Sequence, residues 1–543
     1  MNKMRKGLIV GMLLCMVFVS VACSSTKSSE NAGPSDSTAT AVVDPNVPGW
    51  KSDLSPITFD WYINFSWFTN KWGEDYTSKF ITEKTGVNLN LIVPAGNENE
   101  KLQTMIASGN LPDFLTLDVG DGAIQKLIDG GLVESWNELA DKYDPYFFKA
   151  SDPDKVKWFT QEDGNFYGYP NASSSPNDFK KYGVQYTSNQ AFVVRKDMYE
   201  ALGKPDMRTP EGFLNALVAA KEMFPDVDGQ PLIPISFHEF SENGNYSLES
   251  FLQNFLAIPQ EKDGKLYDRS TDPEYLKWLK TFRKANEMGL FAKDIFIDKR
   301  PQVDEKVTQG RYFSMLYQIS DIGPQNAEIY LKDPNKIYIP IDGPANSNLD
   351  QPTLLGPSIN GWTLTLISKN VKDKKRAIEF MTYMISEEGQ KDIALGVEGI
   401  TYEHVNGKDQ FIESYLKDTS GSTKYGAQQA FWMLMDTNMW LNWAPPTIEP
   451  YLTAQEWSKG KTYNFSEFSQ LDPVGTSDEG IAGTNIKLLW GKTLTKLLLS
   501  KSDAEFDEIY EKFLKERDKL GYDKVIAYQQ KKYEENRAKL SIE

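Results

Sequence analysis

The fold is decided by residues 57–117, which read ITFDWYINFSWFTNKWGEDYTSKFITEKTGVNLNLIVPAGNENEKLQTMIASGNLPDFLTL. Apolar residues alternate with polar ones over 57–63 and 87–93, which is the two-residue period of a strand, and a third strand is expected over 114–117. Residues 72–84 and 98–108 have helical spacing, and a glycine follows each stretch. Strands that alternate with helices predict a mainly parallel sheet flanked by helices, an α/β fold.

The N-terminal residues predict export and lipid attachment. Residues 1–22 have a basic start and an apolar run, which is typical of a secretory signal peptide and too short to span a membrane. The stretch Ser20-Val21-Ala22-Cys23 resembles the lipobox of bacterial lipoproteins, so Cys23 is expected to carry an acyl lipid such as palmitate. The alternative is a chance cysteine after an ordinary signal peptide. Residues 23–55, rich in Ser, Thr, Ala, Asn and Pro, predict a flexible linker that holds the protein on the extracellular face of a cell membrane.

Charge and motif content argue against several classes of function. The net charge is −17 and no Lys/Arg cluster is free of interspersed acids, which argues against nucleic acid as a partner. The only histidines are His238 and His404, and the two cysteines are Cys15 and Cys23, so the sequence offers no His/Cys set for zinc. It contains no P-loop and no G-x-S-x-G motif, and no further apolar run of about 18 residues.

Several short segments occur in a recognisable order between residues 57 and 402. They are SGNLPD (108–113), DGNFYGYP (163–170), VRKD (194–197) with TPEGF (209–213), QGRYFSM (309–315), RAIEF to EGQ (376–390) and GVEGITY (396–402). Together they resemble the family-1 extracellular solute-binding proteins that serve carbohydrate ABC importers, in particular the LplA-like lipoproteins of Gram-positive bacteria. Residues 403–543 have helical character but add little to the resemblance.

The resemblance implies a two-lobed fold of the periplasmic-binding-protein type 2, with ligand held in a cleft between the lobes. Lobe 1 is expected from residues 56–189 and about 336–425, and lobe 2 from about 190–335 and 426–543. The implied function is the capture of an oligosaccharide and its delivery to the permease subunits of an ABC importer. The protein is expected to be a monomer, not an enzyme, and to close around its ligand.

The positions of polar and aromatic residues predict the ligand contacts. Open α/β sheets bind ligands beyond the carboxyl ends of their strands, and Tyr317 and Gln318 follow a strand that is expected over residues 313–316. Sugars lie against aromatic rings and need hydrogen-bond partners for their hydroxyls. The predicted ligand contacts are Asn64, Trp67, Asp118, Asp121, Tyr317, Gln318, Trp362, Glu398, Tyr402 and Trp443.

The sequence leaves open one question about a metal site and two alternative functions. Asp226, Asp228 and Gly229 stand where some relatives carry an EF-hand-like calcium loop, but Gln230-Pro231-Leu232 breaks the alternation of oxygen ligands, which argues against a structural calcium. A lipid-anchored glycoside hydrolase with two catalytic carboxylates is a rival function, because acids are abundant. A peptide-binding receptor of the same architecture is the other.

Overall fold

The computed structural model describes residues 44–182, 187–418, 424–427, 432–443, 449–475 and 477–541. The predicted signal peptide, the predicted lipidation at Cys23 and most of the predicted linker lie outside these residues. Ordered structure begins before residue 56, because Gly49–Lys51 forms the short helix η1 and the buried Trp50 packs edge-on against Tyr146 and Tyr383. Ordered structure is therefore present within the residues predicted as linker.

The first sheet contains the three strands predicted from residues 57–117. Its strands lie in the order β2-β1-β3-β14-β4. Their bounds are Ile57–Ile63 (β1), Val87–Ile92 (β2), Phe114–Asp118 (β3), Gly168–Pro170 (β4) and Thr363–Ile367 (β14). β1 pairs in parallel with β2 and β3, whereas β14 is antiparallel to β3 and β4. The predicted strands are confirmed, and they lie side by side.

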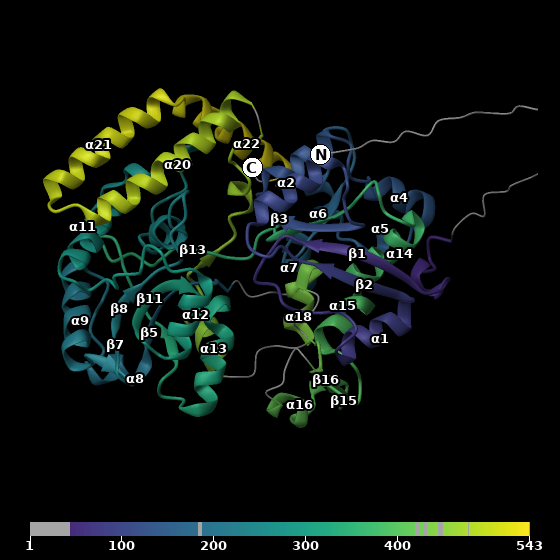
Figure 1. Ribbon diagram of the computed structural model, residues 1–543, viewed down its shortest axis with the longest axis horizontal. Helices are drawn as coiled ribbons and strands as arrows, with labels where there is room; N and C mark the ends of the chain where they lie inside the picture. Colours follow the sequence, from purple (N-terminus) through teal and green to yellow (C-terminus); the bar gives the residue numbers. More distant parts are fainter. Residues whose placement is uncertain are drawn as a thin grey trace, which may run out of the picture. The chain divides into compact units, whose positions relative to one another are not determined.

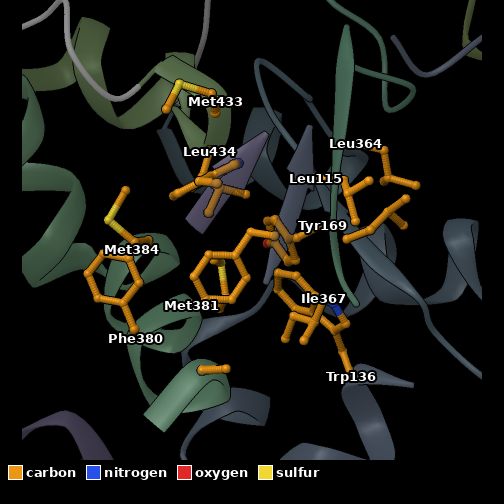
Figure 2. Close-up of a cluster of buried hydrophobic side chains, with 14 of the residues drawn as sticks. Leu115, Trp136, Tyr169, Leu364, Ile367, Phe380, Met381, Met384, Met433 and Leu434 are labelled. Carbon is orange, nitrogen blue, oxygen red and sulfur yellow. The ribbon is translucent and has the colours of Figure 1, made fainter. Parts of the chain in front are cut away.

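Helices cover the first sheet and bury their apolar faces on it, and we call this assembly the first lobe. They are α1 (Tyr76–Thr85), α2 (Glu98–Ser108), α3 (Gly122–Asp129), α4 (Trp136–Tyr143), α5 (Phe147–Ala150), α6 (Pro153–Phe159), α7 (Pro176–Tyr182), α14 (Lys374–Ile385), α15 (Glu387–Leu395) and α18 (Thr437–Trp443). Figure 2 shows how Phe380, Met381 and Met384 of α14 face a core shared with Leu115 of β3 and Trp136 of α4. Residues 376–385 of α14 are all buried, so this helix is a central element of the core.

The second sheet has the order β12-β5-β11-β8. Its strands are Gln190–Arg195 (β5), Ile233–Ser236 (β8), Tyr312–Gln318 (β11) and Tyr338–Pro340 (β12). β11 is antiparallel to β5 and parallel to β8, and β12 is antiparallel to β5. The helices packed with it are α8 (Lys196–Ala201), α9 (Pro210–Met223), η2 (Ser247–Phe251), α10 (Leu252–Phe255), α11 (Pro273–Glu287), α12 (Arg300–Thr308), α13 (Ile319–Lys332) and α19 (Glu449–Ser458). We call this assembly the second lobe.

The chain passes between the lobes, and each sheet contains one reversed strand. In the first sheet only β14 runs against the other strands, and in the second only β5 does. The chain passes from the first lobe to the second between β4 and β5, and it returns between β12 and β14. The reversed strands β5 and β14 are therefore the first sheet strands after each passage. A third passage follows α18, since α18 packs on α7 and α15 whereas α19 packs on α13 and β12. The structure therefore confirms the predicted two-lobed α/β fold.

Three long helices end the chain: α20 (Asp478–Leu499), α21 (Asp503–Lys519) and α22 (Tyr522–Leu540), drawn in yellow in Figure 1. Leu494 and Leu497 of α20 lie in the core of the second lobe. α22 packs against α20 and also reaches α6 of the first lobe, where the Lys539 Nζ donates a hydrogen bond to the Trp158 carbonyl at 3.0 Å. The C-terminal helices thus contact elements of both lobes.

Short paired strands lie outside the two sheets. They are β6 (Asp226–Val227) with β7 (Gln230–Pro231), β9 (Glu261–Lys262) with β10 (Lys265–Leu266), β13 (Leu354–Leu355) with β17 (Thr462–Tyr463), and β15 (Tyr402–Val405) with β16 (Lys408–Phe411). In the β6–β7 hairpin, Asp228 and Gly229 have φ values of 50° and 78°, as a two-residue Asp-Gly turn requires. The segment considered for calcium is therefore a tight hairpin. Among the described residues, none of the helices is long and apolar enough to cross a membrane.

Two predicted boundaries are wrong for identifiable reasons. The helix expected from residue 72 begins at Tyr76, because the Asp75 carboxylate accepts a hydrogen bond from the Ser78 N–H and caps the helix there. The strand expected over residues 313–316 extends through Gln318, since Tyr317 and Gln318 pair with Ala191 and Gln190 of β5. Tyr317 is thus inside a strand that is buried on both faces, where a two-residue period gives no boundary signal.

Candidate functional site

One edge of the first sheet brings together three of the predicted contact residues. β1 and β3 end at this edge because they are parallel, and β14 begins there because it is antiparallel to β3. Asn64 follows β1, and its N–H donates to the Thr116 carbonyl of β3 at 3.0 Å. Trp362 precedes β14, and its carbonyl accepts from the Val119 N–H, just beyond Asp118, at 2.9 Å. The edge therefore places Asn64, Asp118 and Trp362 close together.

Two exposed tryptophans stack beside this edge, and we call them the exposed ring pair. The ring centroids of Trp67 and Trp362 are 6.0 Å apart, with an angle of 12° between the ring planes. Trp67 is 50% exposed and Trp362 is 39% exposed. Phe65 supports both from one side, with centroids 5.5 Å and 5.2 Å away. Large exposed apolar rings that are held in place by neighbours are typical of a binding surface.

Carboxylates surround the exposed ring pair. The pKa of Asp118 is raised above its ordinary value, mainly by burial and further by the charge of Asp121. Hydrogen bonds from the Gly120 N–H and the Trp362 side chain oppose this shift. Asp121 caps α3, since its Oδ1 accepts from the Ala123 N–H at 2.8 Å. Glu98 accepts a hydrogen bond from the Ser66 N–H at 2.7 Å, next to Trp67. The edge thus offers acceptors for hydroxyl groups next to flat rings.

The corresponding edge of the second sheet carries a second stack, which we call the buried ring pair. The rings of His238 and Tyr317 lie 4.1 Å apart with an angle of 15° between them. Tyr317 is fully buried, and its hydroxyl donates to Glu239 Oε1 at 3.0 Å. The Nδ1 of His238 lies 2.6 Å from the Ser247 hydroxyl. Tyr317, predicted as a ligand contact, is therefore covered by its neighbours in this structure.

An ion-pair network borders the buried ring pair. Arg300 lies 2.7 Å from Asp321 and 2.7 Å from Asp304, so its guanidinium is already shared by two carboxylates. Gln318 donates to Asp321 Oδ1 at 2.8 Å. The Nε2 of His238 lies 3.9 Å from Asp321 Oδ2, beyond hydrogen-bond distance.

The imidazole of His238 is uncharged at neutral pH. Burial is the largest cause of its shifted pKa, which is lowered from 6.5 to about 4; Asp321 works against this shift and Arg300 adds to it. Burial also raises the pKa of the Tyr317 hydroxyl well above its usual value, and the charge of Glu239 adds to that shift. The buried ring pair therefore keeps one protonation state across the physiological range.

Tyr246 is a candidate contact that the sequence reasoning missed. It is 48% exposed, and its ring stands edge-on to His238 and Phe251 at 5.7 Å and 5.0 Å. Burial raises the pKa of its hydroxyl, a hydrogen bond with Ser250 lowers it, and the charges of Asp118 and Asp321 raise it further. Tyr246 of the second lobe is thus electrostatically coupled to Asp118 of the first. It could have been found, because it stands in the polar stretch ENGNYS (242–247).

The other predicted contacts lie elsewhere in the first lobe. Glu398 is exposed and forms a β-bridge with the largely buried Tyr402 at the start of the β15–β16 hairpin. Trp443 is the last residue of α18, which packs on α15 and α7. Asn64 is buried and accepts a hydrogen bond from the Tyr62 hydroxyl at 2.7 Å. The structure therefore gathers Asn64, Trp67, Asp118, Asp121 and Trp362 in one place, and Tyr317 with Gln318 in a second.

Known proteins resemble this chain in sequence and in fold. A family model described as "Bacterial extracellular solute-binding protein" matches residues 75–401. Lipoprotein LipO of Bacillus subtilis (strain 168) is 24% identical over 431 residues, covering 76% of this chain and 77% of LipO. The fructooligosaccharide ABC transporter substrate-binding protein FusA of Streptococcus pneumoniae is 26% identical over 226 residues, covering 40% of this chain and 41% of FusA.

Solved structures show the same fold at lower identity. The crystal structure of the alginate-binding protein AlgQ2 without calcium ion has a TM-score of 0.66 at 19% identity, covering 91% of this chain and 99% of AlgQ2. The structure of S. pneumoniae FusA in complex with kestose has a TM-score of 0.68 at 17% identity, covering 89% of this chain and all of that chain.

Proposed function

The chain belongs to the bacterial extracellular solute-binding proteins, and we propose that its solute is an oligosaccharide that it delivers to the permease of an ABC importer. Family membership makes it a binding protein and not an enzyme. The observation that carries the choice of ligand is the exposed ring pair next to Asp118. A pyranose or furanose ring lies with its C–H face on an aromatic plane, while carboxylates accept hydrogen bonds from its hydroxyl groups.

The exposed ring pair suits a sugar better than an extended peptide. Its two ring planes are nearly parallel, and both rings are partly exposed, so a ring face of the stack can lie against the C–H face of a sugar. A peptide would need a row of backbone donors and acceptors, such as those of an unpaired outer strand of a sheet. At this site the strands are paired, since β3 has β1 on one side and β14 on the other. The groups presented are therefore rings and side-chain carboxylates.

The names of relatives support the proposal without deciding the sugar. FusA is named for fructooligosaccharides, and YtcQ of Bacillus subtilis (strain 168), 22% identical over 357 residues, is named for binding polygalacturonan and rhamnogalacturonan. These names cover neutral and acidic sugars, so the ligand class of this chain has to be argued from its own residues.

Closure is the proposed mechanism of capture. Ligand first lies on Trp67 and Trp362 of the first lobe, and Tyr246 of the second lobe then contacts its other face. Tyr246 is suited to this role because it is exposed and feels the charge of Asp118 across the site. A ligand that contacts both lobes favours the closed state, because only that state makes all of the contacts. The permease would recognise the closed form.

We also propose the cellular context from the N-terminal sequence. Cys23 would carry lipid, and the linker after it would hold a monomer at the outer face of the membrane. The name of LipO supports a lipoprotein. We also propose two lobe boundaries. Because β12 pairs with β5 of the second lobe, the chain returns to the first lobe after residue 340. Because Met433 and Leu434 lie in the core of the first lobe, the chain leaves that lobe again after residue 443.

The test is a thermal-shift screen of the mature chain, residues 23–543, with neutral and acidic oligosaccharides. The panel would hold fructo-, manno- and xylo-oligosaccharides and oligogalacturonides, each recovered and checked for cleavage by chromatography. A saturable rise in melting temperature with intact sugar is expected, since a ligand that binds only the native state stabilises it. The Trp67→Ala/Trp362→Ala variant should lose the shift, whereas Phe148→Ala, an exposed ring on α5, should keep it.

Two results would overturn the proposal. Cleaved sugar would make the protein a hydrolase. A shift that survives in the Trp67→Ala/Trp362→Ala variant would remove the exposed ring pair from the site.

A further inference from the structure

A cavity of about 600 Å³ opens between the first lobe and the C-terminal helices. Its first wall is formed by α2 and α3, which contribute Asn99, Gln103 and Asp121. Its second wall is formed by α20 and the segment before it, which contribute Thr484 and Asp472. Binding sites for small molecules typically have volumes of about 300–1,000 Å³, so this cavity has the size of a ligand site.

The cavity is joined to the exposed ring pair by two short stretches of the first lobe. In one, the Ser66 N–H next to Trp67 binds Glu98, and Asn99 of the cavity wall follows Glu98 on α2. In the other, the Asp121 N–H donates to the Asp118 carbonyl at 2.9 Å, and Asp121 lines the cavity. The cavity therefore begins within a few residues of both tryptophans and continues the same edge of the sheet.

The second wall is held in place by contacts with both lobes. The Gln470 amide donates to the Val119 carbonyl, beyond the end of β3, at 3.1 Å. Asp472 is bound by Lys487 of α20 at 2.7 Å and by the Gln529 amide of α22 at 2.8 Å. Each carboxylate oxygen of Asp472 thus has a partner on a different helix. A wall fixed in this way can hold a ligand without first having to be ordered.

The charges around the whole site favour an uncharged ligand. In the cavity, Asp121 and Asp472 are balanced by Lys126 and Lys487. Near the buried ring pair, the cation Arg300 is already shared by two carboxylates. A uronate on the exposed ring pair would bring its carboxylate close to Asp118 and Asp121, and like charges repel.

We propose that this cavity is a second sugar-binding subsite, which takes the far end of an uncharged oligosaccharide whose near end lies on Trp67 and Trp362. The inference rests on the proposed function and adds the length and charge class of the ligand. Asn99, Gln103 and Thr484 supply neutral donors and acceptors for hydroxyl groups. A sugar too short to reach the cavity binds through the exposed ring pair alone.

The test measures affinity against sugar length by calorimetric titration of the mature chain. The probes are fructo-, manno- and xylo-oligosaccharides of two to six units. In the series that binds, the wild-type affinity should rise at least tenfold between the shortest and the longest sugar. Thr484→Trp, which fills the cavity from α20, should remove this gain and change the affinity for the shortest sugar less than twofold. Lys496→Trp, an exposed position further along α20, is the matched control.

A second variant protects the test against misfolding. Asn99 and Gln103 are both exposed on α2, so Asn99→Ala/Gln103→Ala should leave the fold intact and reduce the same gain with length. The subsite is contradicted if these variants weaken all lengths equally or none. If no sugar of any series binds the wild-type chain, the proposed function fails, and the subsite fails with it.

A separate titration tests whether the ligand is charged. Oligogalacturonides of the same lengths should bind at least tenfold more weakly than the neutral series. Tighter binding of the oligogalacturonides, falling steeply with added salt, would overturn the assignment of an uncharged ligand.

Discussion

The exposed and buried ring pairs occupy corresponding edges of the two sheets but have different surroundings. Trp67 and Trp362 stack with an angle of 12° and keep much of their area in solvent. His238 and Tyr317 stack with an angle of 15° and are buried, and Tyr246 and Phe251 stand edge-on to His238. The two pairs have similar angles between their ring planes, but their centroid distances, 6.0 Å and 4.1 Å, and their exposures differ. We propose that the exposed ring pair contacts the ligand, whereas the buried ring pair supports Tyr246 from below.

The buried ring pair should contribute most to stability. Tyr317→Ala removes a fully buried ring and leaves a cavity beside His238, so the free energy of unfolding should fall by about 3–5 kcal/mol. Urea denaturation followed by circular dichroism measures this. Tyr463→Ala, which removes a ring that is 46% exposed, is the control and should cost less than about 0.5 kcal/mol. A loss below about 1 kcal/mol for Tyr317→Ala would contradict the supporting role of the ring.

The same pair should leave a signature in the pH dependence of stability. Because the pKa of His238 is about 4 in the folded chain and 6.5 in the unfolded chain, only the unfolded chain binds the proton between these values. The free energy of unfolding should therefore fall as the pH drops from 6.5 to 4, with a contribution from His238 of up to roughly 3 kcal/mol.

His238→Gln removes this contribution. The difference in unfolding free energy between wild type and variant should change between pH 6.5 and 4 and stay constant above pH 7. The other titrating groups contribute equally to both proteins, so they do not affect this difference. A constant difference from pH 4 to 7 would show that His238 titrates normally.

The exposed ring pair should contribute to affinity and little to stability. Trp362→Ala should weaken binding of the sugar identified in the screen by at least tenfold, about 1.4 kcal/mol, and change the free energy of unfolding by less than about 0.5 kcal/mol. Trp362→Phe keeps a ring face and should recover most of the affinity. Calorimetric titration and urea denaturation of the same samples separate the two quantities. A large loss of stability with unchanged affinity would make Trp362 a packing residue like Tyr317.

The smallest effect is expected at Asp118. Asp118→Asn keeps an oxygen acceptor for the Trp362 side chain but removes the charge, so affinity should fall only roughly threefold. The wild-type affinity should also decrease as the pH falls and this carboxylate becomes protonated, whereas the variant should show no such decrease. Titrations at several pH values measure both effects. Identical pH profiles would mean that the Asp118 charge does not face the ligand.

The sequence predicted the first sheet well because local patterns specify it. The strands over residues 57–63 and 87–92 keep a two-residue period, and α2 has the bounds that were expected from its spacing and the following glycine. Trp67 and Asp118 came together because the parallel strands β1 and β3 end at a common edge, which the order of elements implied. Trp362 joins them because β14 is antiparallel to β3 and begins at that edge, which the order of elements did not imply.

Burial on both faces and long-range packing account for what was missed. β11 is buried on both faces, so the pattern could not show that Tyr317 lies inside the strand. Tyr246 follows no strand end directly, and its position depends on how η2 packs against β11. The cavity between α2, α3 and α20 combines residues about 360 positions apart, which no local pattern reports.

The most direct test of the central claim is a calorimetric titration of the mature wild-type chain and its Trp67→Ala/Trp362→Ala variant with the sugar identified in the screen. The account predicts one saturable site in the wild type, intact sugar afterwards, and affinity weakened at least tenfold in the variant, which should remain as stable as the wild type. Equal affinity of the two proteins would contradict the account, because the exposed ring pair would then have no part in binding.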